Sequence, residues 1–229
     1  DDFMVDPEIG FGKQVGLDDD PDHPNDFFEP FMEEGKKYII DGTYSLPLMK
    51  STEALCYNET LLRKYLNGYE PYTTSGKTVK KFMDELTWDS FMDLCEFVRA
   101  DLNKPEDQQL VKNTSLTHDL GYDSDANLFI TLAEQYGYGY TSIDDYGEAH
   151  LNFNNNNMKG LVKTFASAAK QGYFASAACI NASYCSSYFT KQNCLFCIGS
   201  TAGVKNQNSN EFQVGIARIP QAEGKQAKV

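Results

Sequence analysis

Hydrophobic positions recur at helical spacing in the stretch 88–103. Its apolar residues are Phe91, Leu94, Cys95, Val98 and Leu102. Thr87 stands where an N-cap is expected, and Asp89 in the first turn favours the helix dipole. The chain's only Trp, Trp88, begins this helix and is expected to anchor its first turn rather than to stack on a ligand. The pattern therefore predicts an amphipathic helix that is buried on one side.

Two further stretches carry the same period. One begins near Asp123-Ser124 and ends at Gly137, and the other spans 155–171 and ends at Gly172. Glycine directly after a periodic run is a common helix C-terminus. A shorter helix is expected at 27–34, with Asn25 or Asp26 as its cap.

Strand patterns lie between these helices. In the run 54–57 the residues alternate, with Leu55 and Tyr57 facing one way. The apolar run 194–198 predicts a buried strand, and alternation over 212–216 predicts a last strand. Residues 67–80 are polar and are expected to form a loop. Helices that interleave with short strands indicate an α/β fold, with helices packed on a mixed sheet.

Composition narrows the classes of function. The chain has 229 residues, 41% of them hydrophobic, and a formal net charge of −13. Such a surface repels phosphate backbones, so we expect no nucleic-acid partner. No apolar run reaches 18 residues, so we expect no membrane insertion of this segment. The acidic run 18–24 lacks the glycine and glutamate of a calcium loop and is expected to be solvated.

Six cysteines raise the question of zinc or disulfides. Cys194 and Cys197 have the spacing of a zinc or redox site, and Cys179 and Cys185 would complete four thiolates. However, residues three apart on a strand point to opposite faces, so structural cysteines are the favoured interpretation. A Cys179–Cys185 disulfide stays open for an exported protein. A zinc-dependent cysteine module is the less favoured alternative, and no metal or other cofactor is expected.

Motifs of catalysis are lacking in the sequence. None of the three histidines has a recognisable catalytic setting, and there is no nucleophile elbow, zinc-protease motif, Walker loop or dinucleotide fingerprint. We therefore expect a binding protein and not an enzyme. A glycoside hydrolase that uses two of the many carboxylates is the alternative.

Three small polar clusters remain, at 50–53, 122–127 and 199–203. Each lies at a turn or a helix start, where backbone N–H groups are free to meet ligand oxygens. Taken singly, each would be a cap or a turn; together they suggest a sugar site, with an aromatic face from Tyr122, Tyr184 or Tyr188. The residues that we expect to bind the ligand are Lys50, Ser51, Thr52, Tyr122, Asp123, Ser124, Asn127, Ser200 and Thr201.

The segment 42–58, with its Leu-Pro-Leu-Met-Lys-Ser-Thr sequence followed by Tyr57-Asn58, resembles the lobe-crossing segment of family 1 extracellular solute-binding proteins. These are the sugar-binding subunits of ABC importers. The resemblance continues over most of the chain, in order and spacing, at 86–91, 123–129, 134–137, 151–153, 189–191, 197–203 and 212–220. In that family, positions matching Ser51, Asp123, Asn127, Ser200 and Thr201 border the ligand cleft.

The resemblance implies a type II periplasmic-binding-protein-like fold, mostly one lobe plus part of the other. Residues 1–50 would be a remnant of the N-terminal lobe and the first crossover, 51–198 the C-terminal-type lobe, and 199–229 the return crossover and a strand. The implied function is an extracytoplasmic receptor that delivers a sugar to an ABC transporter permease, with an export signal and a lipid-anchoring cysteine upstream. Such a central fragment is expected to bind ligand poorly by itself.

One departure from the family bears on the ligand. Maltose-type members carry a Trp after the strand that is predicted to end at Ile198, whereas this chain continues with Gly-Ser-Thr-Ala. The loss of that stacking platform favours a smaller sugar or a sugar phosphate, with Lys50 facing the phosphate.

Overall fold

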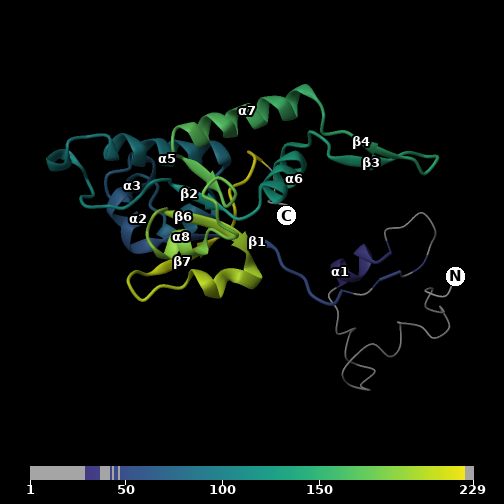
Figure 1. The fold of residues 1–229 in the computed structure, drawn as a ribbon, viewed down its shortest axis with the longest axis horizontal. Helices are drawn as coiled ribbons and strands as arrows, with labels where there is room; N and C mark the ends of the chain where they lie inside the picture. Colours follow the sequence, from purple (N-terminus) through teal and green to yellow (C-terminus); the bar gives the residue numbers. More distant parts are fainter. Residues whose placement is uncertain (1–28, 37–41, 43, 46, 225–229) are drawn as a thin grey trace, which may run out of the picture. The chain divides into compact units, whose positions relative to one another are not determined.

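The computed structural model describes residues 29–36, 42, 44–45 and 47–224 (Figure 1). The chain divides into two compact units, 1–51 and 52–229. In the first unit, the short helix α1 (Glu29–Glu34) forms within the predicted range 27–34. The predicted caps Asn25 and Asp26, and the acidic run 18–24, lie outside the described residues. The three-segment division inferred from the sequence stays a prediction.

The second unit is built on a five-stranded sheet with the order β5-β2-β6-β1-β7. The strands are β1 (Glu53–Asn58), β2 (Leu120–Tyr122), β5 (Phe174–Ser176), β6 (Phe196–Ser200) and β7 (Val214–Ala217). β2 runs parallel to β5 and β6, whereas β1 runs antiparallel to β6 and β7. The mixed sheet and its flanking helices confirm the α/β fold that was predicted.

Helices and one hairpin complete this unit (Figure 1). The helices are α2 (Glu59–Leu66), α3 (Glu70–Thr73), α4 (Val79–Asp84), α5 (Trp88–Leu102), α6 (Asp125–Tyr136), α7 (Asn156–Lys170) and α8 (Ser186–Thr190). Two 3-10 turns, η1 (Glu106–Gln108) and η2 (Thr201–Gln207), add to them. Among the described residues, none of the helices has the length and apolar character that crossing a membrane requires.

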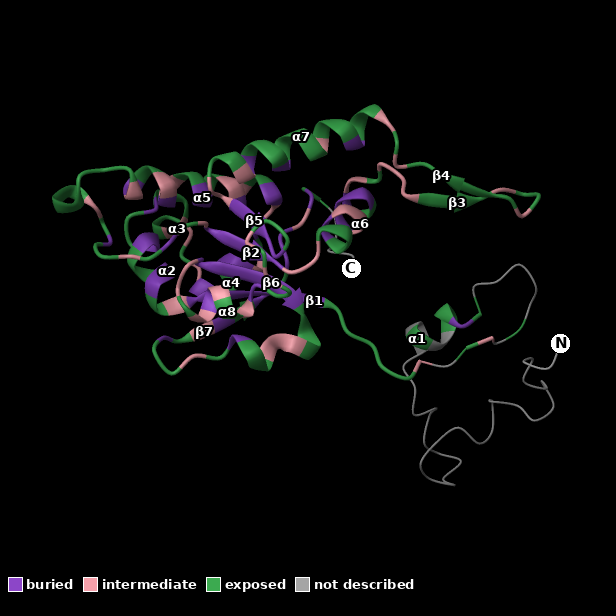
Figure 2. Cartoon of the chain, in the orientation of Figure 1, coloured by how far each residue is buried: buried purple, intermediate pink, exposed green. Residues whose placement is uncertain are grey.

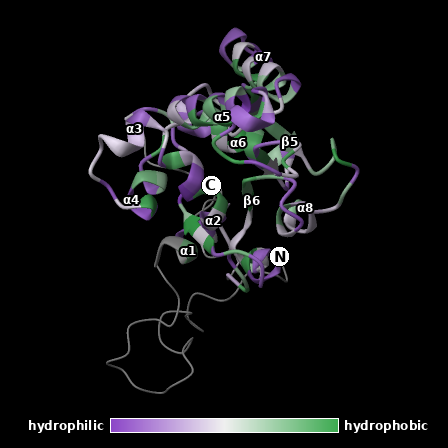
Figure 3. Ribbon diagram, turned by 90° about the vertical axis from the view of Figure 1, so that its left-hand side faces the viewer, coloured by the Kyte–Doolittle hydropathy of each residue, from purple (hydrophilic) through white to green (hydrophobic). Residues whose placement is uncertain are grey.

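The three long amphipathic helices are confirmed as α5, α6 and α7. Thr87 caps α5 in a capping box with Ser90, in which each side chain bonds the backbone N–H of the other residue. Ser124 caps α6, which ends at Gly137 in the left-handed conformation (φ 68°). Asn155 caps α7 by accepting the Met158 N–H at 2.9 Å. Figure 3 shows hydrophilic and hydrophobic positions mixed along α7, as expected for an amphipathic helix.

The loop predicted over residues 67–80 was wrong in part, because two short helices interrupt it. This stretch contains α3 and the start of α4. Pro71 is tolerated because it lies in the first turn of α3, where its missing N–H costs no hydrogen bond. Thr78 caps α4 by accepting the Lys81 N–H at 3.3 Å. Helices this short have too few turns to show a hydrophobic period.

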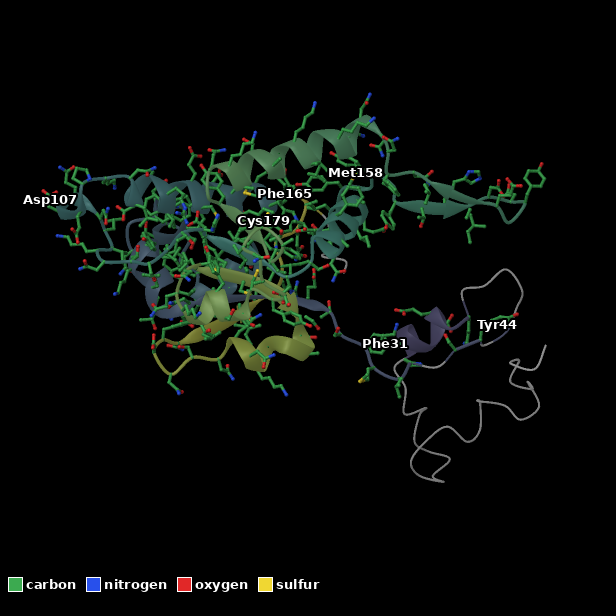
Figure 4. All side chains as sticks on the ribbon, viewed as in Figure 1. Phe31, Tyr44, Asp107, Met158, Phe165 and Cys179 are labelled. Carbon is green, nitrogen blue, oxygen red and sulfur yellow. The ribbon has the colours of Figure 1, made fainter. Side chains whose placement is uncertain are left out.

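Two apolar clusters lie on opposite faces of the sheet, since alternate residues of β1 belong to different clusters. Figure 2 shows that β1, β2, β5 and β6 are largely buried. The larger cluster gathers Leu55, Tyr57 and the buried faces of α2, α5 and α7. Trp88 is 2% exposed and donates from Nε1 to Gln135 Oε1 at 3.0 Å, which confirms that it is a packing anchor. Met158 and Phe165 lie on α7 (Figure 4), and both are buried. The smaller cluster contains four cysteines and lies beside α8.

The hairpin of β3 (Thr141–Ile143) and β4 (Ala149–Leu151) extends beyond the ends of α6 and α7 (Figure 1). All six strand residues are exposed. Its apolar side chains are open as well, with Ile143 63% and Leu151 73% exposed. The hairpin therefore adds little to either apolar cluster.

Candidate functional site

The strand directions bring three of the predicted polar segments to one edge of the sheet. β2 and β6 are parallel and end at this edge, and the antiparallel strand β1 begins there. Thr52 and Glu53 therefore lie beside Ser200 and Thr201, and Asp123 lies directly after β2. Ligands of open α/β sheets commonly bind outside the carboxyl ends of the strands. This edge is the candidate site.

Glu53 occupies the centre of the candidate site. It is 7% exposed and stands opposite Ser200 in the β1–β6 register. Its carboxylate accepts a hydrogen bond from the Tyr122 hydroxyl and another from Asn127 Nδ2 at 3.1 Å. Burial raises the pKa of Glu53, and the nearby charge of Asp123 raises it further. Glu53 thus joins β1, β2 and α6 at a single buried group.

Asp123 lies beside the carboxyl end of β6, next to Ile198 and Gly199. Its backbone N–H donates to Ile198 O at 3.0 Å, and its Oδ1 accepts the Cys185 N–H at 2.6 Å. Its Oδ2 approaches Gly199 so closely that a Cβ at Gly199 would overlap it. Burial raises the pKa of Asp123, whereas the hydrogen bonds from Cys185 lower it. The absence of a side chain at Gly199 therefore leaves the space that the Asp123 carboxylate occupies.

Three hydroxyl groups lie on the segments next to the two carboxylates, and each hydroxyl oxygen accepts a hydrogen bond from a backbone N–H. Thr201 Oγ1 accepts from Thr52 N at 3.2 Å, and Ser200 Oγ accepts from Ala202 N at 3.2 Å. Ser124 Oγ accepts from Asn127 N at 3.2 Å, as its N-cap role requires. A hydroxyl that accepts through its oxygen keeps its hydrogen for donation. The edge therefore offers hydroxyl donors next to carboxylate acceptors.

The three tyrosines considered as aromatic platforms have different places. The Tyr122 ring is fully buried, so Tyr122 contributes its hydroxyl to Glu53 rather than an open ring face. The hydroxyl of Tyr188 bonds His118 Nδ1 at 2.7 Å, before the start of β2 and so at the opposite end of that strand. Tyr184 is 66% exposed and directly precedes Cys185, the donor to Asp123. Of the three, Tyr184 is the ring that the fold leaves open near the candidate site.

Lys50 and Ser51 belong to the first unit of the chain. In that unit the Lys50 ammonium pairs with the carboxylate of Glu34. The predicted role of Lys50 opposite a phosphate stays a prediction, as does the ligand role of every other predicted residue.

Glu53 and Cys185 lie at the candidate site but were not among the residues that the sequence analysis predicted for it. Glu53 lay within the first polar cluster, and its signal was a charged residue that opens an otherwise apolar strand. Cys185 acts through its backbone N–H, which leaves no mark in the sequence. Both depend on contacts between segments that are far apart along the chain.

The cysteines do not form a metal site in the part of the chain that the structure describes. One argument from the sequence was wrong in detail. β6 begins at Phe196, so Cys194 precedes the strand, and strand alternation does not separate it from Cys197. Both thiols lie in the same apolar cluster and are fully buried.

No protein-family model and no curated protein sequence matches the chain. Among solved structures, the fold is similar to the GacH receptor of Streptomyces glaucescens, which was crystallised unliganded and with acarbose or an acarbose homologue. The TM-score is 0.55 at 13% sequence identity, over 86% of this chain and 44% of the receptor. The chain thus spans less than half of the receptor's length. This likeness confirms the periplasmic-binding-protein-like fold.

Proposed function

We propose that this chain is the carbohydrate-binding part of an extracytoplasmic receptor that delivers a sugar to an ABC transporter permease. The observation that carries the proposal is the convergence of Glu53, Asp123, Asn127 and Ser200 on one sheet edge, through hydrogen bonds and strand register. Sugar hydroxyls both donate and accept, so a mixed set of hydroxyl donors and carboxylate acceptors matches them. The receptor-like fold supports the same interpretation.

In the proposed mechanism the receptor binds the sugar reversibly and breaks none of its covalent bonds. The ligand's hydroxyls donate to Asp123 and accept from the hydroxyls of Ser200 and Thr201, while Tyr184 offers a ring face to the sugar's C–H side. A second lobe closes over the ligand, so that the full set of hydrogen bonds exists only in the closed state. In this proposal, residues 1–50 and 199–229 provide the crossovers between lobes.

A neutral sugar is the favoured ligand over a sugar phosphate. Glu53 and Asp123 place acidic side chains at the edge, and the chain as a whole carries a net charge of −13. A phosphate would meet repulsion from both carboxylates unless a cation such as Lys50 offsets it. Binding of glucose 1-phosphate in preference to glucose would contradict the proposal of a neutral ligand.

The test is a thermal-shift screen of acarbose, monosaccharides and disaccharides, followed by calorimetry on the sugars that stabilise the protein. Recovery of intact sugar supports a receptor, whereas release of hydrolysis products would identify a glycoside hydrolase instead. Calorimetry on this chain and on a longer protein that adds a second lobe tests whether this chain alone binds more weakly. Equal affinities would contradict the two-lobe mechanism.

Ser200→Ala is the matched variant for the site. Loss of one hydroxyl donor should weaken binding about five-fold, the effect of one net hydrogen bond. Ser167→Ala removes the same atom from an exposed position on α7 and should leave the affinity unchanged. If both variants bind equally well, the Ser200 hydroxyl at the end of β6 is not part of the site.

A further inference from the structure

Four buried thiols gather on the face of the sheet that α8 covers. They are the side chains of Cys56, Cys185, Cys194 and Cys197, each with 0% exposure. With Phe189 and Phe212 they belong to a single apolar cluster. All four are free thiols in this structure. Their proximity gives several possible pairings, which differ in geometry.

The sulfurs of Cys185 and Cys194 both lie next to Gly121. A Cβ at Gly121 would lie 3.2 Å from the sulfur of Cys185 and 3.4 Å from the sulfur of Cys194. The same point lies 2.9 Å from Cys185 Cβ. The two sulfurs therefore share the space that the missing side chain of Gly121 leaves open. Nothing larger than glycine fits at this position of β2 while both thiols are in place.

The pairing of Cys56 with Cys197 has less suitable geometry. These residues stand directly opposite each other in the antiparallel β1–β6 ladder. The bonds Thr201 N–H to Thr52 O and Asn58 N–H to Leu195 O place hydrogen-bonded pairs at every second position, and Cys56–Cys197 is one of them. Directly opposed residues hold their Cβ atoms about 4.5–5.5 Å apart, and hydrogen-bonded pairs lie at the wider end of that range. A disulfide prefers Cβ atoms about 3.8 Å apart, so this pair would strain the ladder.

We propose that Cys185 and Cys194 form a disulfide when the chain folds under oxidising conditions. The bond would tie the residue that precedes α8 to the segment that enters β6. Cys185 is also the residue whose N–H donates to Asp123 Oδ1 at 2.6 Å. The disulfide would thus fix the backbone donor that positions this carboxylate at the candidate site.

The chemistry is thiol–disulfide exchange with a small or protein disulfide as the oxidant. The thiolate of one cysteine attacks the donor disulfide, which forms a mixed disulfide and releases one donor thiol. The second cysteine attacks the protein sulfur of the mixed disulfide, which closes the internal bond and releases the second donor thiol. Two protein thiols are oxidised, one donor disulfide is reduced to two thiols, and the two cysteine protons leave with the donor thiols.

Burial determines when this exchange takes place. The apolar surroundings raise the pKa of Cys185 to about 12 and the pKa of Cys194 well above its usual range. Because the thiolate is the reactive form, the packed and reduced protein should exchange slowly. The bond should therefore form while the chain folds, and a protein folded under reducing conditions should stay reduced.

The experiment compares refolding with a mixture of oxidised and reduced glutathione to refolding with reduced glutathione alone. The protein is then unfolded, alkylated and digested with trypsin. Trypsin releases Cys185 in peptide 171–191 and Cys194 in peptide 192–205. We expect these two peptides to be linked after oxidative refolding, and fragmentation to place the bond between Cys185 and Cys194.

Two variants separate the pairings. Cys197→Ala should keep the linked peptides, whereas Cys194→Ala should abolish them. The proposal is overturned if all six cysteines are alkylated after oxidative refolding. It is equally overturned if peptide 51–63, which carries Cys56, is linked to 192–205, or if Cys179 is the partner of Cys185. Intact mass before digestion, lower by two hydrogens, reports the bond independently of peptide recovery.

Discussion

Glu53 combines two properties that usually exclude each other in one side chain. It is nearly buried, and it is a carboxylate with no cation among its hydrogen-bond donors, which are Tyr122 and Asn127. Burial of such a group disfavours its charged form. The folded protein therefore holds the Glu53 proton more tightly than the unfolded chain does.

This property predicts a pH dependence of stability. Burial raises the pKa of Glu53 above its ordinary value of 4.5. Its contribution to the free energy of unfolding is therefore present below about pH 4.5 and is lost as pH rises through the folded-state pKa. Glu53→Gln keeps the shape and removes the charge, so its urea-unfolding free energy should fall less between pH 4.5 and 7 than that of the wild type.

The control for this experiment is Glu106→Gln, at an exposed position in η1. It should follow the wild-type pH profile. A wild-type slope in the Glu53→Gln variant would show that another group controls stability in this range.

Gly199 gives a second prediction at the residue scale. An alanine there would place its methyl group against Asp123 Oδ2. We expect Gly199→Ala to displace Asp123 and to reduce ligand affinity at least ten-fold, because a misplaced carboxylate loses its bonds to the ligand. Gly203→Ala is the matched control, since no atom lies within 4 Å of the added methyl group. Calorimetry with the sugar found in the screen would reveal the difference, and equal affinities would refute this role of Gly199.

Part of the candidate site was predictable because some residues have local roles. Ser124 and Asn127 lie at a helix start, and the sequence shows that start directly. The role of Glu53 was not predictable in the same way, since it depends on the alignment of β1 with β6 and on the place of α6. Polar clusters mark where a chain turns, whereas the register of distant strands decides which clusters meet.

At the scale of elements, the capping box of α5 is a local signal with a measurable effect. Thr87→Ala removes the side-chain acceptor for the Ser90 N–H, which lies 3.1 Å away. We expect a loss of about 1 kcal/mol in the free energy of unfolding. Thr164→Ala makes the same change at an exposed site on α7 and should cost less. Urea titration would compare the two variants, and equal losses would show that the cap is unimportant.

The ion pair between α5 and the segment before β2 is a second feature at this scale. Arg99 donates to Asp119 from Nε at 2.9 Å, and its Nη2 lies 2.8 Å from the other carboxylate oxygen. Asp119 is fully buried. Arg99→Met would leave this carboxylate without its cation, at a cost of about 3–5 kcal/mol.

The control for Arg99→Met is the double variant Arg99→Met/Asp119→Leu. It removes both charges and should regain much of the lost stability. A single variant as stable as the wild type in urea would contradict the importance of the pair.

The predictability of elements follows their length and their signals. α5, α6 and α7 were predicted because 12 or 15 residues display a full hydrophobic period with a cap. β2 and β5 have only three residues each, too few to show alternation. α8 has five residues and its N-cap side chain makes no capping hydrogen bond, so neither a hydrophobic period nor a cap marks this helix in the sequence. These short elements owe their conformation to the sheet and the clusters around them.

At the scale of the whole molecule, the β3–β4 hairpin should be dispensable for folding of the second unit. Its strand residues are exposed, and the two strands pair only with each other. Replacing residues 141–151 by a short Gly-Ser linker should change the melting temperature by only a few degrees, since little apolar surface is lost. Thermal unfolding by circular dichroism measures this. Loss of cooperative unfolding would mean that the hairpin supports the sheet.

The position of β1 in the sheet has a consequence for biosynthesis. Its only strand partners in the described sheet are β6 and β7, which the ribosome makes long after β1. Until those segments emerge, Leu55, Cys56 and Tyr57 have no strand to pair with. The nascent chain therefore carries an unpaired apolar segment while more than half of the 229 residues are synthesised. The sheet can therefore close around β1 only after β6 and β7 have emerged, and a holdase-type chaperone that covers this apolar segment would protect the chain during that interval.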